Sequence, residues 1–109
     1  MLFRSDPIEI TEVMIKNRTY AKDEDGESCD YIELHNTSDR AVSLRGYALS
    51  DTDANLQKWI LPDVTLAADG YLIVYASGKN RTGSALHAGF KLSSDESVFL
   101  ANPNGQLIE

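Results

Sequence analysis

Short apolar stretches closed by turns are the feature that most constrains what this chain can fold into. Apolar and polar residues alternate within them, and residues 30–36 show the alternation most clearly. Ile32 and Leu34 would point to one side of an extended strand, and Glu33 and His35 to the other. No segment sustains the ~3.6-residue period of an amphipathic helix. Many short strands of this kind predict an all-β sandwich or barrel.

The strand candidates share this pattern or a short apolar run, and they lie at residues 8–15, 30–36, 42–49, 58–61, 71–76 and 97–100. In the first of them, the apolar positions change parity after Ile10. An extra residue in one strand of a pair causes such a shift, so we expect a β-bulge near Glu12. Residues 71–76 are apolar at both parities, which predicts a central strand covered on both faces.

The length of 109 residues suits one domain with one core, so we expect a single domain over residues 1–109. Residues 105–109 follow an Asn-Pro-Asn-Gly turn and have the pattern of a strand that has just begun. We therefore expect an excised fragment of a larger protein, in which the sandwich lacks its last strand. The edge left unpaired would allow two copies to form a homodimer by strand pairing.

Charge and composition exclude several classes of function. Lys and Arg total 10 against 17 Asp and Glu, a net charge of -7, whereas nucleic-acid binding needs a basic surface. No apolar run approaches the roughly 20 residues that cross a bilayer, so we expect no membrane insertion. The lone Cys29 forms no intramolecular disulfide, and with two histidines it makes a poor zinc ligand set.

Six strings follow one another along the chain: ITEV at 10–13, DYIELHN at 30–36, LRGYALSD at 44–51, KWILP at 58–62, GYLIVYA at 70–76 and FKLS at 90–93. Together, and in this order, they resemble the lamin tail domain family. Residues 76–81 and 86–87 resemble its bacterial branch, whose members lie beside spore-coat-kinase-like domains in secreted proteins. The resemblance implies an immunoglobulin-like β-sandwich that usually continues past Glu109 by at least one strand.

The resemblance also implies a function. With no catalytic constellation in the sequence, it predicts a non-catalytic binding or adhesion module that is accessory to a larger secreted or cell-envelope bacterial protein. The expected partner is a protein or a cell-surface polymer, and the expected location is extracellular or the cell envelope, although residues 1–5 carry no signal peptide. Two alternatives stay open, a structural domain of a filament assembly and a substrate-positioning accessory of an adjoining catalytic domain.

Candidate binding residues lie on the polar side of two strands. Glu33 and His35 are two positions apart and share one face, but no nucleophile in a recognisable setting accompanies them, so we assign them to contact rather than catalysis. Tyr31 and Tyr75 are expected to be exposed and to complete this binding set. Trp59 stands in a short apolar run before a proline and is expected in the core.

An acidic loop raises the question of a metal. An EF-hand loop needs an oxygen ligand at its first position and a Glu at its twelfth. With Gly26 at the sixth position, Ala21 is first and Ile32 is twelfth, so the motif is absent. Asp23, Asp25 and Asp30 could still form a looser calcium site, although a solvated acidic loop is the favoured interpretation. No other cofactor is expected. The basic residues Lys79, Arg81 and Lys91 are expected on a charge-balanced surface.

Overall fold

A computed structural model describes residues 7–14, 22–83, 85–92 and 97–108. These residues form ten strands and no helix, and none of them belongs to a segment of helix that could cross a membrane. The strands are β1 (Ile8–Met14), β2 (Tyr31–Asn36), β3 (Val42–Ser43), β4 (Ala48–Ser50), β5 (Trp59–Ile60), β6 (Thr65–Leu66), β7 (Tyr71–Tyr75), β8 (Arg81–Thr82), β9 (Leu86–His87) and β10 (Phe99–Ala101).

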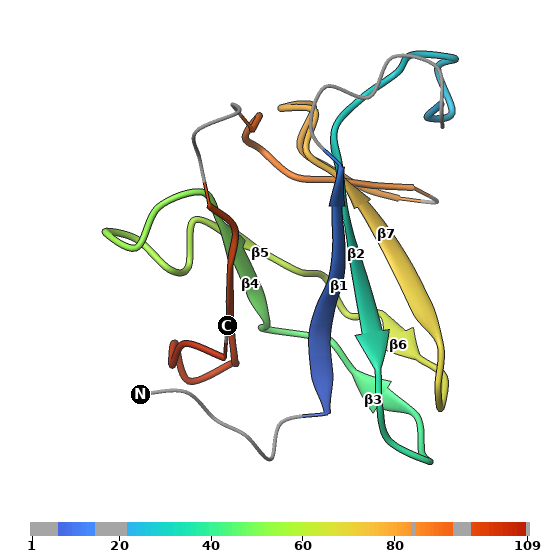
Figure 1. The fold of residues 1–109 in the computed structure, drawn as a ribbon, viewed down its shortest axis with the longest axis vertical. Helices are drawn as coiled ribbons and strands as arrows, with labels where there is room; N and C mark the ends of the chain where they lie inside the picture. Colours follow the sequence, from blue (N-terminus) through green and yellow to red (C-terminus); the bar gives the residue numbers. More distant parts are fainter. Residues whose placement is uncertain (1–6, 15–21, 84, 93–96, 109) are drawn as a thin grey trace.

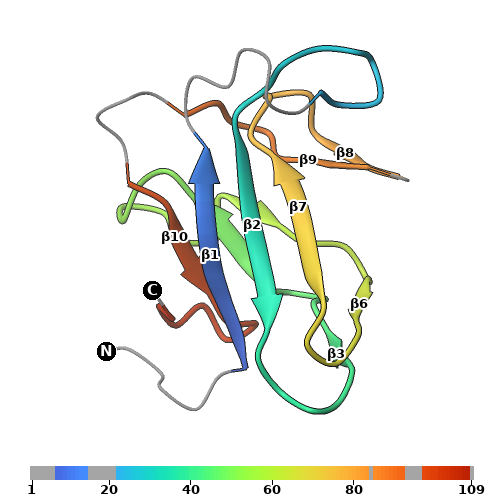
Figure 2. The same cartoon turned by 45° about the vertical axis from the view of Figure 1, so that its right-hand side comes forward.

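Two main sheets form the layers of the fold. The larger has the order β1-β2-β7-β9-β8, the smaller has the order β10-β4-β5, and β3 pairs with β6 beside them. Figure 1 shows the long strands β1, β2 and β7 on one side and β4 with the C-terminal segment on the other. In Figure 2, β1, β2 and β7 lie side by side in front of β10 and β4. The all-β, immunoglobulin-like sandwich that the sequence predicts is confirmed.

The alternation along β2 determines which side chains form the core. Ile32 and Leu34 are fully buried between the layers, whereas Glu33 and His35 point to the outer face and are partly exposed. The other fully buried apolar side chains come from both layers and the turns between them: Ile8, Leu44, Leu49, Val74 and Leu100. Burial of these side chains stabilises the fold because it removes apolar surface from water.

The predicted bulge is present in β1. Ile10 pairs with Leu34 and Glu12 with Glu33, so Thr11 has no partner residue on β2. The bulge puts Ile10 and Val13 on the same face as their partners Leu34 and Ile32, although they are three residues apart, and Val13 at the end of the strand is still 38% exposed. The expectation of a β-bulge near Glu12 is therefore confirmed.

The prediction that β7 is covered on both faces is wrong. β7 does lie between β2 and β9, but β9 pairs only with its last two residues, Val74 and Tyr75. At the other end of the strand Tyr71 is 57% exposed. The outward-facing positions of β7 are aromatic or β-branched residues, which are common on an open sheet face as well as on a covered one. The sequence pattern alone does not distinguish the two cases.

Trp59 is in the core, as predicted, with an exposure of 6%. Its indole Nε1–H donates a hydrogen bond to Asn80 Oδ1 at 2.9 Å, which satisfies the polar atom of the buried ring. The Asn-Pro-Asn-Gly turn is also present, since the Gly105 N–H donates to the Asn102 carbonyl at 2.9 Å. After this turn, Leu107 pairs with Ala101 of β10 in an isolated antiparallel bridge.

Candidate functional site

The acidic loop is a folded turn organised by the side chain of Asp23. Asp23 Oδ1 accepts hydrogen bonds from the backbone N–H groups of Asp25 at 2.9 Å and Glu27 at 3.0 Å. The backbone closes the same turn, because the Gly26 N–H donates to the Asp23 carbonyl at 3.0 Å. Gly26 has a φ of 78°, a left-handed conformation that glycine adopts without a steric penalty. The Asp-x-Asp-Gly sequence is thus typical of the turn that it forms.

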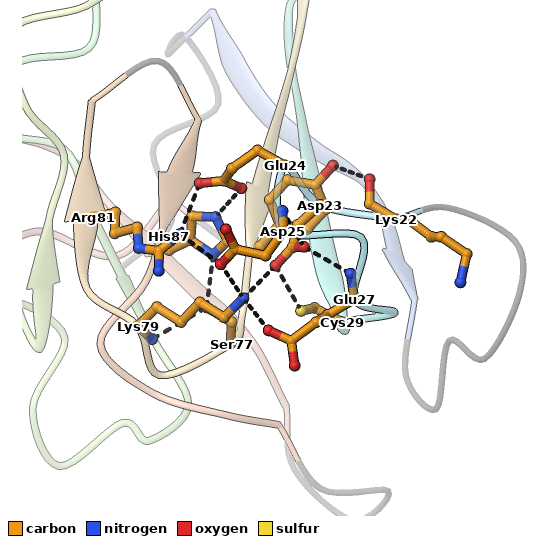
Figure 3. A network of polar contacts seen from close by, with 11 residues as sticks. Lys22, Asp23, Glu24, Asp25, Glu27, Cys29, Ser77, Lys79, Arg81 and His87 are labelled. Atoms are coloured by element: carbon orange, nitrogen blue, oxygen red, sulfur yellow. Dashed lines mark hydrogen bonds and ion pairs between the residues drawn. The ribbon is translucent and has the colours of Figure 1, made fainter.

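Lys79 reaches into this turn from the loop after β7. Its Nζ donates to Asp23 Oδ2 at 2.6 Å, Asp25 Oδ2 at 2.9 Å and Glu27 Oε1 at 2.6 Å, as the dashed lines in Figure 3 show. The hydrogen bond that Lys79 donates to Asp23 is the largest cause of the raised pKa of this ammonium. Burial by itself would raise the pKa of Asp23, but the hydrogen bond from Lys79 and those from the turn outweigh it and hold that pKa well below its usual range.

Two observations bear on the calcium hypothesis. Asp23 and Asp25 do lie together, but the third carboxylate close enough to share an ion with them is Glu27, and Asp30 is not in this group. In addition, the Lys79 ammonium already lies among the three carboxylates. A calcium ion there would have to displace a charge that the chain itself supplies, so these residues are a poor fit to a metal.

A chain of hydrogen bonds runs beside this cluster through a fully buried histidine. His87 Nδ1 lies 2.7 Å from Ser77 Oγ, and His87 Nε2 lies 2.6 Å from Glu24 Oε1. Glu24 Oε2 in turn accepts a hydrogen bond from Arg81 at 3.0 Å. The bond to His87, with a smaller contribution from Arg81, lowers the pKa of Glu24. Sequence reasoning missed this arrangement because no motif links the three positions.

The order serine, histidine, glutamate resembles a catalytic triad, but the surroundings do not supply the rest of one. Ser77 Oγ accepts a hydrogen bond from the Lys79 N–H at 3.1 Å. The neighbouring N–H groups of Gly78 and Asn80 both donate to the Ala88 carbonyl. Each of these amides is therefore engaged, and none remains to stabilise an oxyanion at Ser77. The chain of hydrogen bonds joins the acidic loop to β9, which is a structural role.

Cys29 lies at the edge of the same cluster. Its thiol donates to Asp23 Oδ2 at 3.3 Å, and burial, together with this negative neighbour, raises the pKa of Cys29 to about 11. The thiol is therefore protonated at neutral pH and is a weak nucleophile. A hollow of about 290 Å³ opens next to it, lined by residues that include Asp30, Ser77 and Lys91.

A second group of polar and aromatic side chains lies on the outer face of the larger sheet. The rings of His35 and Tyr71 stack at 4.2 Å with 8° between their planes. His35 Nε2 lies 2.7 Å from Asp69 Oδ1, and Nδ1 lies 3.4 Å from Glu9 Oε1. The hydrogen bond to Asp69 is the main cause of a raised pKa of His35, and Glu9 adds to it.

The four candidate binding residues share this outer face, since Tyr31 of β2 pairs with Tyr75 of β7 in the register that also aligns His35 with Tyr71. Glu33 Oε1 accepts a hydrogen bond from Thr11 at 2.8 Å. The expectation that Tyr31 is exposed is wrong, because its exposure is 3% and its hydroxyl donates to a β1 glutamate.

Tyr75 is partly buried, and its ring stacks on that of His87 at 5.1 Å. Its hydroxyl donates to the Lys22 carbonyl at 3.2 Å, so this side chain ties β7 to the acidic loop. The open end of the face is formed instead by Tyr71, which the sequence analysis assigned to a covered strand. A tyrosine that follows an Asp-Gly turn at a strand start was the available signal for it.

Comparison with known proteins tests the resemblance that the strand motifs indicate. A family model described as Lamin Tail Domain matches residues 4–109, which is nearly the whole chain. A search of curated proteins finds none that matches. The resemblance is therefore confirmed at the level of the family.

Proposed function

Because this chain belongs to the lamin tail domain family, an immunoglobulin-like family that is usually non-catalytic, we propose that it is a binding module that recognises a macromolecular partner through the outer face of β1, β2 and β7. We propose further that it is accessory to a larger secreted or cell-envelope bacterial protein. Its partner is then a protein or a cell-surface polymer.

One observation carries the proposal, the open aromatic surface around Tyr71. The ring is 57% exposed and is held in place by its stack on His35, which two carboxylates position in turn. A rigid, exposed aromatic ring surrounded by polar groups is typical of recognition surfaces, because it buries a large area on binding at little cost in side-chain entropy. By contrast, the carboxylates around Lys79 are already engaged in ion pairs within the chain.

A co-sedimentation assay tests this function. The purified domain is mixed with isolated envelopes of the cells that produce it, and the bound fraction is measured for the wild type, for Tyr71→Ser and for Ile60→Ser. Ile60 is a matched control, because it is a large apolar side chain that is 52% exposed on β5 of the other sheet. We expect Tyr71→Ser to lose binding and Ile60→Ser to keep it, with both variants melting as the wild type does.

Equal loss of binding in the two variants, or no binding of the wild type, would contradict the proposal. A blot of fractionated source cells with an antibody against this domain tests the location separately. A large band in the envelope or the medium supports the extracellular assignment. A cytoplasmic band that pellets would instead favour the structural role in an assembly.

A further inference from the structure

We propose that the outer face of β1, β2 and β7 binds an extended segment of a partner protein whose lysine or arginine side chains lie two positions apart. The inference rests on the proposed function and names the chemistry of its partner. The charges on this face, their exposure and their spacing along the strands support it.

The face carries a surplus of negative charge. Four carboxylates surround its centre, namely Glu9, Glu12, Glu33 and Asp69. Within the described part of the chain, the only cationic group that pairs with any of them is His35, whereas Lys58, Lys79 and Arg81 form their ion pairs with other acids. The net charge of -7 adds a long-range attraction for a basic partner.

These carboxylates are accessible. The side chain of Asp69 is 85% exposed and that of Glu9 is 47% exposed. Glu33 Oε1 accepts a hydrogen bond from Thr11, and a carboxylate has acceptor capacity for further donors. The exposed ring of Tyr71 stands beside them, in the same rank of the sheet as His35. Such a ring can cover the aliphatic part of a lysine or the plane of a guanidinium.

The spacing of the carboxylates determines the form of the partner. They form two rows across the strands, which we call ranks. In one rank Glu9 is paired with His35, next to Asp69, and in the other Glu12 is paired with Glu33. Glu33 and His35 are two residues apart on β2, a separation of about 6.6 Å in a strand. Side chains two positions apart in an extended peptide have the same separation and point to the same side. An extended segment with alternate basic residues therefore places one charge at each rank.

The same charges disfavour the other occupants of such a face. A second copy of this chain would bring four like charges against these four, which is repulsive. Nucleic-acid phosphates would be repelled in the same way. A neutral glycan could stack on Tyr71 but would gain nothing from the surplus of carboxylates. Charge complementarity thus selects a basic polypeptide segment.

Fluorescence anisotropy with synthetic peptides tests this inference directly. The probe is a labelled nine-residue peptide that alternates serine and lysine, and the comparison peptide has the same composition with its lysines in one block. We expect the full chain to bind the alternating peptide more tightly at low ionic strength, and we expect added salt to abolish the binding. Equal affinity for the two peptides, or no binding of either, would overturn the proposal.

Matched variants locate the binding on the face. Glu33→Gln and Asp69→Asn remove one charge each and keep the shape of the side chain, and Asp53→Asn and Asp63→Asn do the same at exposed positions outside the face. We expect each face variant to weaken peptide binding by about two- to fivefold, as for an exposed ion pair, and the controls to leave it unchanged. Equal weakening in both pairs would mean non-specific attraction to an acidic protein and would overturn the inference.

The two proposals can fail separately. Envelope binding that depends on Tyr71, in a protein that ignores the alternating peptide, would overturn the basic-segment inference and leave the binding function intact. A Tyr71-dependent dimer in sedimentation equilibrium, or binding of a neutral wall polysaccharide that Glu33→Gln does not affect, would identify another occupant and would also overturn it. Loss of both kinds of binding would remove the proposed function as well.

Discussion

Lys79 is the residue whose role departs most from what its sequence context indicates. In the sequence it is one of three basic residues of an expected charge-balanced surface, but in the structure its ammonium lies among three carboxylates where the sequence analysis considered calcium. Folding brings the charge of Lys79 into the acidic turn, so the turn needs no ion from solution. This difference can be measured.

The first prediction concerns Lys79→Ala. We expect this variant to melt below the wild type, because three carboxylates then lose the cation that they share and, among the described residues, only Asp25 keeps one, from Arg81. Millimolar calcium should raise the melting temperature of the variant and leave that of the wild type unchanged, since an ion that binds only the folded form stabilises it. Lys91→Ala, which removes an exposed lysine with no ion pair in the described chain, is the control. A calcium-dependent rise in the wild type would restore the calcium hypothesis.

Asn36 is a fully buried polar side chain of the larger sheet, with an exposure of 0%. Its Nδ2 donates to the carbonyls of Arg40 at 2.8 Å and Leu66 at 3.0 Å, and its Oδ1 accepts from the Ser38 N–H at 3.0 Å. This one amide thereby ties the backbone of the loop after β2 to β6.

The second prediction is that Asn36→Asp is strongly destabilising. A carboxylate would set an oxygen against carbonyl oxygens and lose both donors, and we expect the free energy of unfolding to fall by about 2–3 kcal/mol. Urea denaturation measures it, and Asn104→Asp in the exposed turn after β10 serves as the control. Equal effects of the two substitutions would show that the buried hydrogen bonds are not the cause.

At the scale of the element, the bulge in β1 is the point where the local pattern and the pairing agree. Thr11 is the extra residue, and the alternation resumes beyond it, with Glu12 on the outer face and Val13 on the face of Ile32. A regular strand of the same sequence would turn either Ile10 or Val13 to the wrong face. The bulge is thus a consequence of the hydrophobic pattern.

The third prediction compares two one-residue deletions in β1. Deleting Thr11 leaves Ile10 paired with Leu34 and Glu12 with Glu33, so every remaining side chain keeps its face. If residues 10–14 keep their pairing, deleting Glu9 moves Ile8, which is 1% exposed, to the outer face, at a cost of about 1.5–3 kcal/mol if its burial is lost. We expect the Thr11 deletion to melt at the higher temperature of the two. The reverse order would mean that the bulge itself, rather than the facing of its neighbours, stabilises β1.

At the scale of the whole molecule, ionisable groups at two separate places on the larger sheet limit the stability of the fold from both ends of the pH range. The pKa of His35 is raised from 6.5, mainly by the hydrogen bond to Asp69. The stabilisation that this gives is fully present below pH 6.5 and is lost as the pH rises through the raised pKa. The pKa of Glu24 is lowered from 4.5, mainly by the hydrogen bond to His87. This stabilisation of the fold is fully present above pH 4.5 and is lost as the pH falls through the lowered pKa. Asp25, bound by Lys79, acts in the same direction as Glu24.

The fourth prediction is therefore a maximum of thermal stability between pH 4.5 and pH 6.5. Melting followed by circular dichroism from pH 3 to pH 9 measures it. Asp69→Asn removes the main partner of the imidazolium, so it should flatten the decline above pH 6.5 and leave the acid limb as it is. A melting temperature that does not change on the alkaline side would contradict the assignment of this limb to His35.

Much of the fold is accessible from the sequence because the relevant signals are local. Alternation in β2, the parity change in β1 and the Asn-Pro-Asn-Gly turn each extend over a few residues, and each is found in the structure. Exposure was harder to predict. Tyr31 and Tyr71 are both tyrosines on the outer parity of neighbouring strands, yet one is 3% and the other 57% exposed. Their difference depends on what lies over each end of the sheet.

The sequence alone determined the all-β class, the facing of the main strands, the position of the bulge and the family, because backbone propensity and side-chain period act between near neighbours. Only the tertiary structure decided the candidate sites. Lys79 and Asp23 are 56 residues apart, and His87 and Glu24 are 63 residues apart. The pairing of β9 with β7 brings such groups within hydrogen-bond distance, and a charge has no preferred partner until chain topology gives it one.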